Sequence, residues 1–258
     1  MEALVGYEVR DRVGYITLDR PDKRNALSPE MVTQLKNAVD QAEDDPECKV
    51  VVLAANGEAF CAGADLAYIK SLQNNSYKEN LADSRHLMEL FIKIYRSSKV
   101  YISRVQGHAL AGGCGLASVC DFSFTVPEAK FGYTEVKIGF IPAIVMVFLL
   151  RKIGEGKAKE LLFTGEIVEA DRALAFGLIN AILPSEQLNS YVHTFAMKLC
   201  GETSAESLAR TKQMIARVQD LPLEEALNYA AAQNAEARDG ADCKRGIAAF
   251  LNKEKISW

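Results

Sequence analysis

The stretch GHALAGGCGLASVCD, residues 107–121, decides how this chain folds. It follows an apolar, β-branched stretch and combines a glycine turn with small apolar residues. Small side chains let a ligand approach the main chain closely, and amides at a helix N-terminus point toward negative charge. We therefore expect a strand end, a glycine turn and the first turn of a buried helix.

The rest of the first two thirds of the chain alternates between strand and helix patterns. A hairpin is expected over residues 7–20, and Ser28, Pro29 and Glu30 carry the cap, proline and acid signals of a helix start. The other apolar stretches indicate strands at 49–55, 100–107 and 121–126 and a helix at 84–94. Strands that alternate with helices predict a mainly parallel sheet in an α/β fold.

From about Pro184 onward, the pattern is helical only. The segment PLEEALNYAAAQNAEARDG, residues 222–240, is alanine-rich and periodic, with more apolar content than one small solvated helix needs. Helices that must bury a face against something favour self-association of this region.

Composition excludes several classes of function. The 258 residues are 49% hydrophobic and 25% charged, with a net charge of −4, which argues against a nucleic-acid or anionic-membrane partner. No stretch is typical of a secretory signal or a membrane span. The six cysteines lack C-x-x-C spacing, which favours reduced thiols in the cytoplasm over a metal site. His86 and His193 lack companions for metal binding, and a Ser-His-Asp set is not apparent.

A second stretch of small residues, AFCAGADL at 59–66, also follows an apolar strand. Two backbone amides that converge on one point form an oxyanion hole, in which each donor is worth roughly 10²–10³ in rate. For either stretch alone, close helix–strand packing is the preferred explanation of the Gly and Ala residues, and the pair favours the oxyanion hole. The segment GCGLAS, residues 113–118, matches the glycine motif of dinucleotide-binding proteins poorly. That motif usually follows the first strand of the fold, and here the segment comes after about a hundred residues.

The stretch KFGYTEVKIGFIPA, residues 130–143, places Glu135 among apolar and aromatic residues. A carboxylate in such surroundings has a raised pKa, which suits general acid–base catalysis. An exposed glutamate on a strand is the alternative.

Together, the segments at 20–28, 59–66, 107–121, 131–142 and 246–254 resemble the enoyl-CoA hydratase/isomerase (crotonase) superfamily over essentially the whole chain. The resemblance implies an α/β spiral of ββα units over residues 1–195, which holds an acyl-CoA site, and a C-terminal helical trimerisation region over residues 196–258. It also implies an acyl-CoA thioester substrate, a homotrimer or dimer of trimers, and no cofactor, since coenzyme A is part of the substrate.

The resemblance further implies catalytic roles. The amides of Ala64 and Gly112 would form the oxyanion hole, and Glu135 would transfer the proton. Hydratases of this family usually carry a second glutamate, at the position of Gly115, and this chain lacks it. The stretch YTEVKIGFIPAIV, residues 133–145, is most similar to methylglutaconyl-CoA hydratases of leucine breakdown.

Hydration of a 2-enoyl-CoA by one glutamate is therefore the expected reaction. A lone glutamate suits double-bond isomerisation equally well, and a catalytically inactive acyl-CoA binder is a third reading.

Coenzyme A contacts are expected in two places. The turn RPDKRNAL, residues 20–27, resembles the family's adenine and phosphate site, so Lys23, Arg24 and Ala26 are candidates, together with Ala62 in the neighbouring glycine stretch. Solvated turn charges are the alternative for the two basic residues. A C-terminal element with Phe250 and Lys253 matches one that in relatives reaches coenzyme A, sometimes from a neighbouring subunit. Asp65 is expected to cap a helix.

Overall fold

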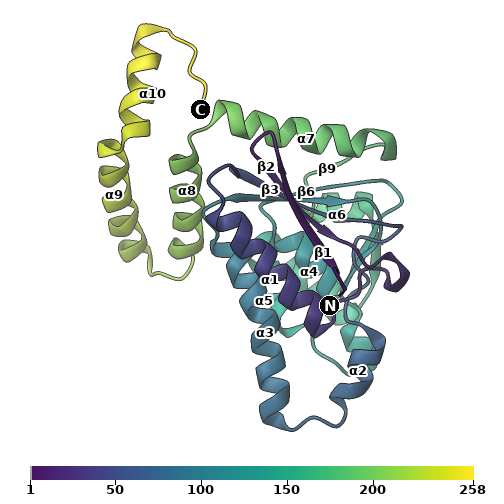
Figure 1. Cartoon of the computed structure of the whole chain (residues 1–258). Coiled ribbons are helices and arrows are strands. Elements are labelled where there is room, and N and C mark those ends of the chain that lie inside the picture. The colour runs from purple at the N-terminus through teal and green to yellow at the C-terminus, as the bar shows by residue number, and fades with distance from the viewer. Residues whose placement is uncertain (1) are drawn as a thin grey trace.

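The fold is built on one large sheet and one small sheet, as a computed structural model that describes residues 2–258 shows (Figure 1). The six strands of the large sheet are ordered β1-β2-β3-β4-β6-β9. Their bounds are β1 Val5–Arg10, β2 Val13–Leu18, β3 Val50–Ala55, β4 Val100–Val105, β6 Phe122–Thr125 and β9 Ala181–Ile182. The hairpin β1–β2 is antiparallel and every other pairing is parallel, which confirms the expected mainly parallel sheet.

The small sheet has the order β5-β7-β8. Its strands are β5 Ala109–Leu110, β7 Lys130–Gly132 and β8 Ile167–Glu169. Strand β5 pairs in parallel with β7, and Leu110 lies opposite Gly132. This pairing brings the segment after Gly132 beside the glycine turn that follows β5.

Ten α-helices and two short 3-10 helices are found in the part of the chain that the structure describes. They are η1 Pro21–Lys23, α1 Pro29–Asp44, α2 Leu66–Leu72, α3 Tyr77–Arg96, α4 Gly112–Val119, η2 Glu135–Ile138, α5 Ala143–Thr164, α6 Ala170–Phe176, α7 Ser185–Glu202, α8 Ala205–Val218, α9 Leu223–Asp239 and α10 Ala241–Asn252. Helix α7 runs along one face of the large sheet and packs on β2, β3, β4 and β6. Helices α1 and α4 pack on the sheet as well, at β1 and β2 and at β4, respectively.

Local signals account for the elements that carry the site. Ser28 caps α1 by accepting a hydrogen bond from the amide of Met31, and the apolar stripe of that helix, formed by Met31, Leu35, Ala38 and Val39, is buried. All six residues of β3 are buried, as expected for a strand covered on both faces. Among the described residues, none of the helices is long and apolar enough to cross a membrane.

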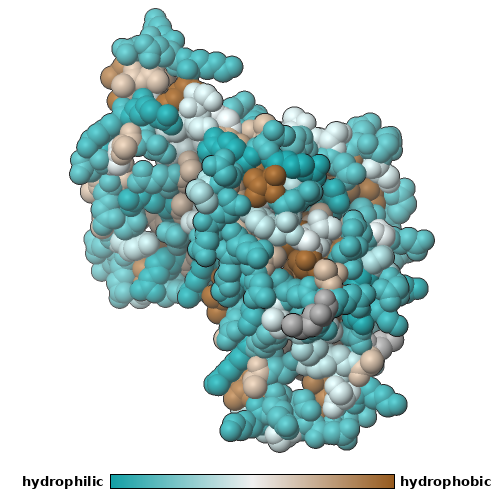
Figure 2. Space-filling model, viewed as in Figure 1, coloured by the Kyte–Doolittle hydropathy of each residue, from teal (hydrophilic) through white to brown (hydrophobic). Residues whose placement is uncertain are grey.

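The C-terminal helices α8, α9 and α10 stand beside the sheet-based part of the molecule (Figure 1). The expected boundary at residues 195/196 falls inside α7, which ends at Glu202, and α8 still contacts β4 and α3 of the sheet-based part. Apolar residues interrupt the hydrophilic surface over this region in Figure 2. The exposed apolar side chains of α9 and α10 are Leu223, Leu227, Ile247, Phe250 and Leu251.

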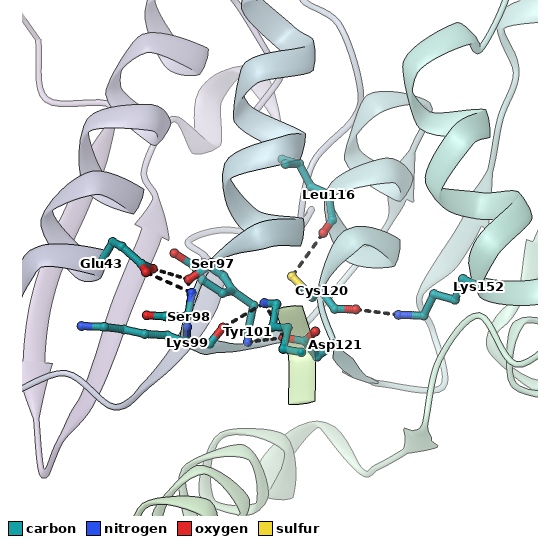
Figure 3. A network of polar contacts seen from close by, with 10 residues as sticks. Glu43, Ser97, Ser98, Lys99, Tyr101, Leu116, Cys120, Asp121 and Lys152 are labelled. Carbon is teal, nitrogen blue, oxygen red and sulfur yellow. Dashed lines mark hydrogen bonds and ion pairs between the residues drawn. The ribbon is translucent and has the colours of Figure 1, made fainter. Parts of the chain in front are cut away.

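A network of polar contacts lies where β4 and β6 begin (Figure 3). The carboxylate of Asp121 accepts hydrogen bonds from the amide of Tyr101 at 2.7 Å and from Nζ of Lys212 at 2.8 Å. Nζ of Lys152 donates to the carbonyl of Cys120 at 2.7 Å, and burial lowers the pKa of this lysine. Because Cys120 follows the last residue of α4, the network holds the far end of the helix whose first residue is Gly112.

Candidate active site

Ala64 lies in a turn whose two flanking peptide groups are fixed. Leu27 and Ala64 form a parallel β-bridge, in which the Leu27 amide donates to the Gly63 carbonyl at 2.7 Å and the Asp65 amide donates to the Leu27 carbonyl at 2.9 Å. Within residues 2–258, the Ala64 amide donates to no protein group. An exposed, unpaired amide between two fixed peptide groups is suited to bind an incoming oxygen.

Gly112 is the first residue of α4, so its amide belongs to the group that a helix leaves without an internal partner. The turn before it is set by Ala111, which has a φ of 50° and whose amide donates to the Gly132 carbonyl at 2.7 Å. A Cβ at the next residue, Gly113, would lie 2.7 Å from the Cβ of Cys61. Only glycine therefore lets the start of α4 approach the stretch at 59–66 so closely.

The two glycine stretches are in direct contact. Cys61 forms a parallel bridge with Ala109, and a Cβ at Gly63 would lie 2.8 Å from the Cβ of Ala111. A Cβ at Gly112 would lie 3.0 Å from Cδ1 of Leu27, the same residue that fixes Ala64. The structure thus brings together the two amide donors that the sequence predicts.

Glu135 begins the 3-10 helix η2, three residues after Gly132. It therefore lies on a helical turn and not on a strand, which was the alternative expectation. Its Oε2 atom is buried and has no hydrogen-bond partner among the residues described. Burial raises the pKa of the Glu135 carboxyl, as predicted from its apolar surroundings. The hydrogen bond from Ala111 to Gly132 ties its segment to the loop that carries Gly112.

The position of Gly115 is closely surrounded by apolar side chains. A Cβ there would overlap Cγ1 of Val145 and lie 3.0 Å from Cε1 of Phe91. A second carboxylate is absent at this point of α4, and hydrocarbon occupies the space.

Asp65 caps α2, as the sequence predicts, and has a second role that the sequence analysis missed. Its Oδ1 accepts hydrogen bonds from the amides of Ala67 and Tyr68, and its Oδ2 pairs with the guanidinium of Arg20 at 2.9 Å. Burial alone would raise the pKa of Asp65, but these amides and Arg20 lower it. Arg20 lies 45 residues before Asp65, so no local pattern could have identified this pair.

The candidate coenzyme A residues fall into two groups. Lys23 and Arg24 are exposed in the turn after β2, Ala26 is buried beside them, and the Ala62 amide donates to the Arg24 carbonyl at 3.0 Å. The structure thus brings these four residues together, next to the Ala64 turn.

The other two candidates do not join this group within one chain. Phe250 lies in α10, and Lys253 directly follows that helix. Helix α10 is at the opposite end of the molecule from α2 (Figure 1). Phe250 is 82% exposed.

Comparison with known proteins assigns the chain to one family. The model of the enoyl-CoA hydratase/isomerase family matches residues 8–258. A Thermus thermophilus protein with the provisional name enoyl-CoA hydratase is 41% identical over 95% of this chain and 96% of its own length. The crotonyl-CoA hydratase of Syntrophomonas wolfei is 30% identical over 97% of this chain and 96% of its own length.

Solved structures resemble the whole chain as well. The enoyl-CoA hydratase of Mycobacterium smegmatis matches with a TM-score of 0.92 and 30% identity, covering 100% of this chain and 99% of that one. The enoyl-CoA hydratase of Shewanella pealeana matches with a TM-score of 0.93 and 27% identity, covering 99% and 96%. The chain is therefore an enzyme of the enoyl-CoA hydratase/isomerase family and has its α/β crotonase fold.

Proposed function

We propose that this enzyme hydrates a 2-enoyl-CoA to a 3-hydroxyacyl-CoA with one glutamate, Glu135. One observation carries the proposal. Oε2 of Glu135 is buried and unpaired, and the segment before it is hydrogen-bonded to the loop that carries the Gly112 amide. Relatives named as enoyl-CoA hydratases support the same reaction. A carboxylate with a raised pKa can exchange a proton near neutral pH more readily than an exposed one.

The thioester oxygen accepts hydrogen bonds from the amides of Ala64 and Gly112. This contact stabilises the enolate that forms when water adds to the double bond. Glu135 takes a proton from water as the water oxygen bonds to the β-carbon. The protonated Glu135 then gives that proton to the α-carbon, so that one O–H and one C=C π bond are replaced by C–O and C–H bonds. The carboxylate ends in its starting state.

The coenzyme A part of the substrate lies along the turn with Lys23, Arg24, Ala26 and Ala62 in this proposal. Two exposed basic side chains beside the Ala64 turn suit phosphate groups. The acyl group is branched or carboxylated, like 3-methylglutaconyl. The support for this part is the resemblance of residues 133–145 to methylglutaconyl-CoA hydratases.

The enzyme acts as a homotrimer or a dimer of trimers in this proposal. The support is the row of exposed apolar side chains on α9 and α10, which a second copy would cover. Phe250 and Lys253 then reach coenzyme A bound by a neighbouring subunit. The thiols of Cys61, Cys114 and Cys120 have pKa values raised to about 12 by burial, which suits reduced residues in the cytoplasm.

Double-bond isomerisation is the second candidate, and one observation favours it. Moving a double bond needs a single group that removes and returns a proton, and Glu135 is one such group without a second carboxylate at Gly115. An inactive acyl-CoA binder is the third candidate.

Product analysis distinguishes the three. Purified enzyme is given crotonyl-CoA, 3-methylglutaconyl-CoA and, separately, a 3-enoyl-CoA, and products are separated by chromatography and mass. A product heavier by one water from either 2-enoyl substrate supports hydration. Conversion of only the 3-enoyl substrate, without a mass change, supports the isomerase. Thioester binding with no product in any reaction leaves the binder.

A further inference from the structure

The face of α4 that begins at the Gly112 amide continues to Gly115. Residues three apart on a helix lie on the same side, so a side chain at position 115 would extend from the face on which Gly112 lies. The thiol of the adjacent Cys114, whose pKa burial raises, lies close enough to Glu135 for that carboxylate to raise the pKa further, so a side chain at position 115 would start near Glu135. The chain has no side chain there.

The neighbours of Gly115 come from two other helices. Val145 lies in the first turn of α5, Phe91 lies in α3, and both are buried. A Cβ at Gly115 would overlap Cγ1 of Val145 and lie 3.0 Å from both Cβ of Val145 and Cε1 of Phe91. The overlap with Cγ1 is closer than real carbon contacts and the two 3.0 Å contacts are unusually tight, so even alanine at 115 requires a neighbour to move.

Neither neighbour can move easily. Val145 is β-branched, so its χ1 is restricted, and the side chain is buried. The ring of Phe91 is stacked on Phe148, with 5.6 Å between ring centroids, and Phe148 also contacts Tyr95. The hydrocarbon that fills the position is thus fixed from both sides.

We propose that Val145 is a specificity-determining residue, which limits this active site to one carboxylate by occupying the space of a side chain at position 115. The catalytic part of this inference rests on the proposed function, whereas the steric part does not. In wild-type enzyme the wall beside α4 is apolar, so water that reacts at Glu135 is oriented by that carboxylate alone.

A double-mutant cycle tests the steric part without any activity measurement. The variants are Gly115→Ala, Val145→Ala and the double variant, with melting temperature as the readout. Overpacking of a fixed core predicts that Gly115→Ala lowers the melting temperature by about 4–8 °C. When Val145 is already alanine, the same change at Gly115 should cost less than half of that shift.

A matched control is Gly156→Ala, because Gly156 is also helical and a Cβ there has no atom within 4 Å. This variant should keep the wild-type melting temperature or exceed it. If Gly115→Ala alone is insoluble but the double variant folds, that result supports the steric part as well. A Gly115→Ala shift that is equal in both backgrounds, or no shift, overturns it.

The catalytic part is tested by Gly115→Glu alone and combined with Val145→Ala. The single variant should lose folded protein or fall below wild-type hydration of crotonyl-CoA. The combination should hydrate at least about tenfold faster than Val145→Ala and gain a second ionisation in its pH–rate profile. A Gly115→Glu variant that folds normally and exceeds the wild-type rate overturns the inference, as does a combination no faster than Val145→Ala. If neither the wild-type enzyme nor Val145→Ala hydrates crotonyl-CoA, but the melting temperatures show that the changes at positions 115 and 145 depend on each other, the proposed function fails and the steric part stands.

Discussion

Gly63 lies directly against Ala111, so close that a Cβ on the glycine would be 2.8 Å from the alanine Cβ. Gly63 precedes Ala64, and Ala111 precedes Gly112. The contact therefore fixes the spacing of the two candidate amide donors, although 48 positions of sequence separate them. A donor displaced by about 1 Å loses much of its effect on a developing charge, because electrostatic stabilisation depends on preorganised geometry.

Gly63→Ala should lower kcat at least about a hundredfold, since the added methyl group pushes the two loops apart. The φ of Gly63 is +92°, which adds backbone strain for alanine. Gly177→Ala is the matched control, because Gly177 has a φ of +76° but no atom within 4 Å of an added Cβ. Steady-state kinetics of both variants checks the prediction. Equal loss of kcat in the two would show that strain, and not the contact, is responsible.

Asp65→Ala should destabilise the enzyme and also lower its kcat. The variant loses the cap of α2, worth about 0.5–2 kcal/mol, and the ion pair with Arg20. Because the Asp65 amide holds one side of the Ala64 turn, loosening of this residue should reach the donor amide. Ser76→Ala removes the exposed cap of α3 and serves as the control. Denaturant unfolding and kinetics should show both losses for Asp65→Ala and a stability loss alone for Ser76→Ala. A wild-type kcat in a destabilised Asp65→Ala would contradict a positioning role.

The sequence was sufficient to predict local features of the fold and site. The Ser28 cap, the buried β3 strand, the two glycine stretches and the apolar setting of Glu135 depend on nearby residues, and all four are confirmed. Each follows from periodicity, small side chains or helix-end chemistry that a short window of sequence displays.

The features that sequence could not supply are long-range contacts. Val145 fills the space at Gly115 from 30 positions away, and Arg20 reaches Asp65 from 45 positions away. Nothing in either local pattern specifies which side chain will lie opposite.

Glu135→Gln should make the folded protein more stable at neutral pH. Burial raises the pKa of Glu135, so ionisation is less favourable in the folded than in the unfolded chain. The wild-type enzyme therefore loses stability as the pH rises from the unfolded toward the folded pKa. Since glutamine does not ionise, the variant should be more stable than the wild-type enzyme near pH 7.5 and equally stable near pH 4. Denaturant unfolding at both pH values checks this difference. A wild-type enzyme more stable than the variant near pH 7.5 would contradict an unpaired buried carboxylate.

Phe250→Glu should weaken self-association, because it places a charge within the exposed apolar row of α9 and α10. Light scattering should show a lower mass than for the wild-type enzyme, and the KM for the acyl-CoA should rise if a neighbouring subunit contributes to its binding. Lys78→Glu in α3 is a control for added charge outside this row. Identical masses for Phe250→Glu, the control and the wild-type enzyme would exclude this row as the interface.

The most direct test of the account follows the ultraviolet absorbance of crotonyl-CoA and 3-methylglutaconyl-CoA during incubation with wild-type enzyme and Glu135→Gln. Glu47→Gln, which changes an exposed glutamate, controls for the amide substitution itself. We predict that wild-type and Glu47→Gln remove the conjugated chromophore of at least one substrate and form a 3-hydroxyacyl product, and that Glu135→Gln is slower by at least about 10³. Loss of the chromophore at the wild-type rate in Glu135→Gln, or no loss with the wild-type enzyme, would contradict hydration by a single glutamate.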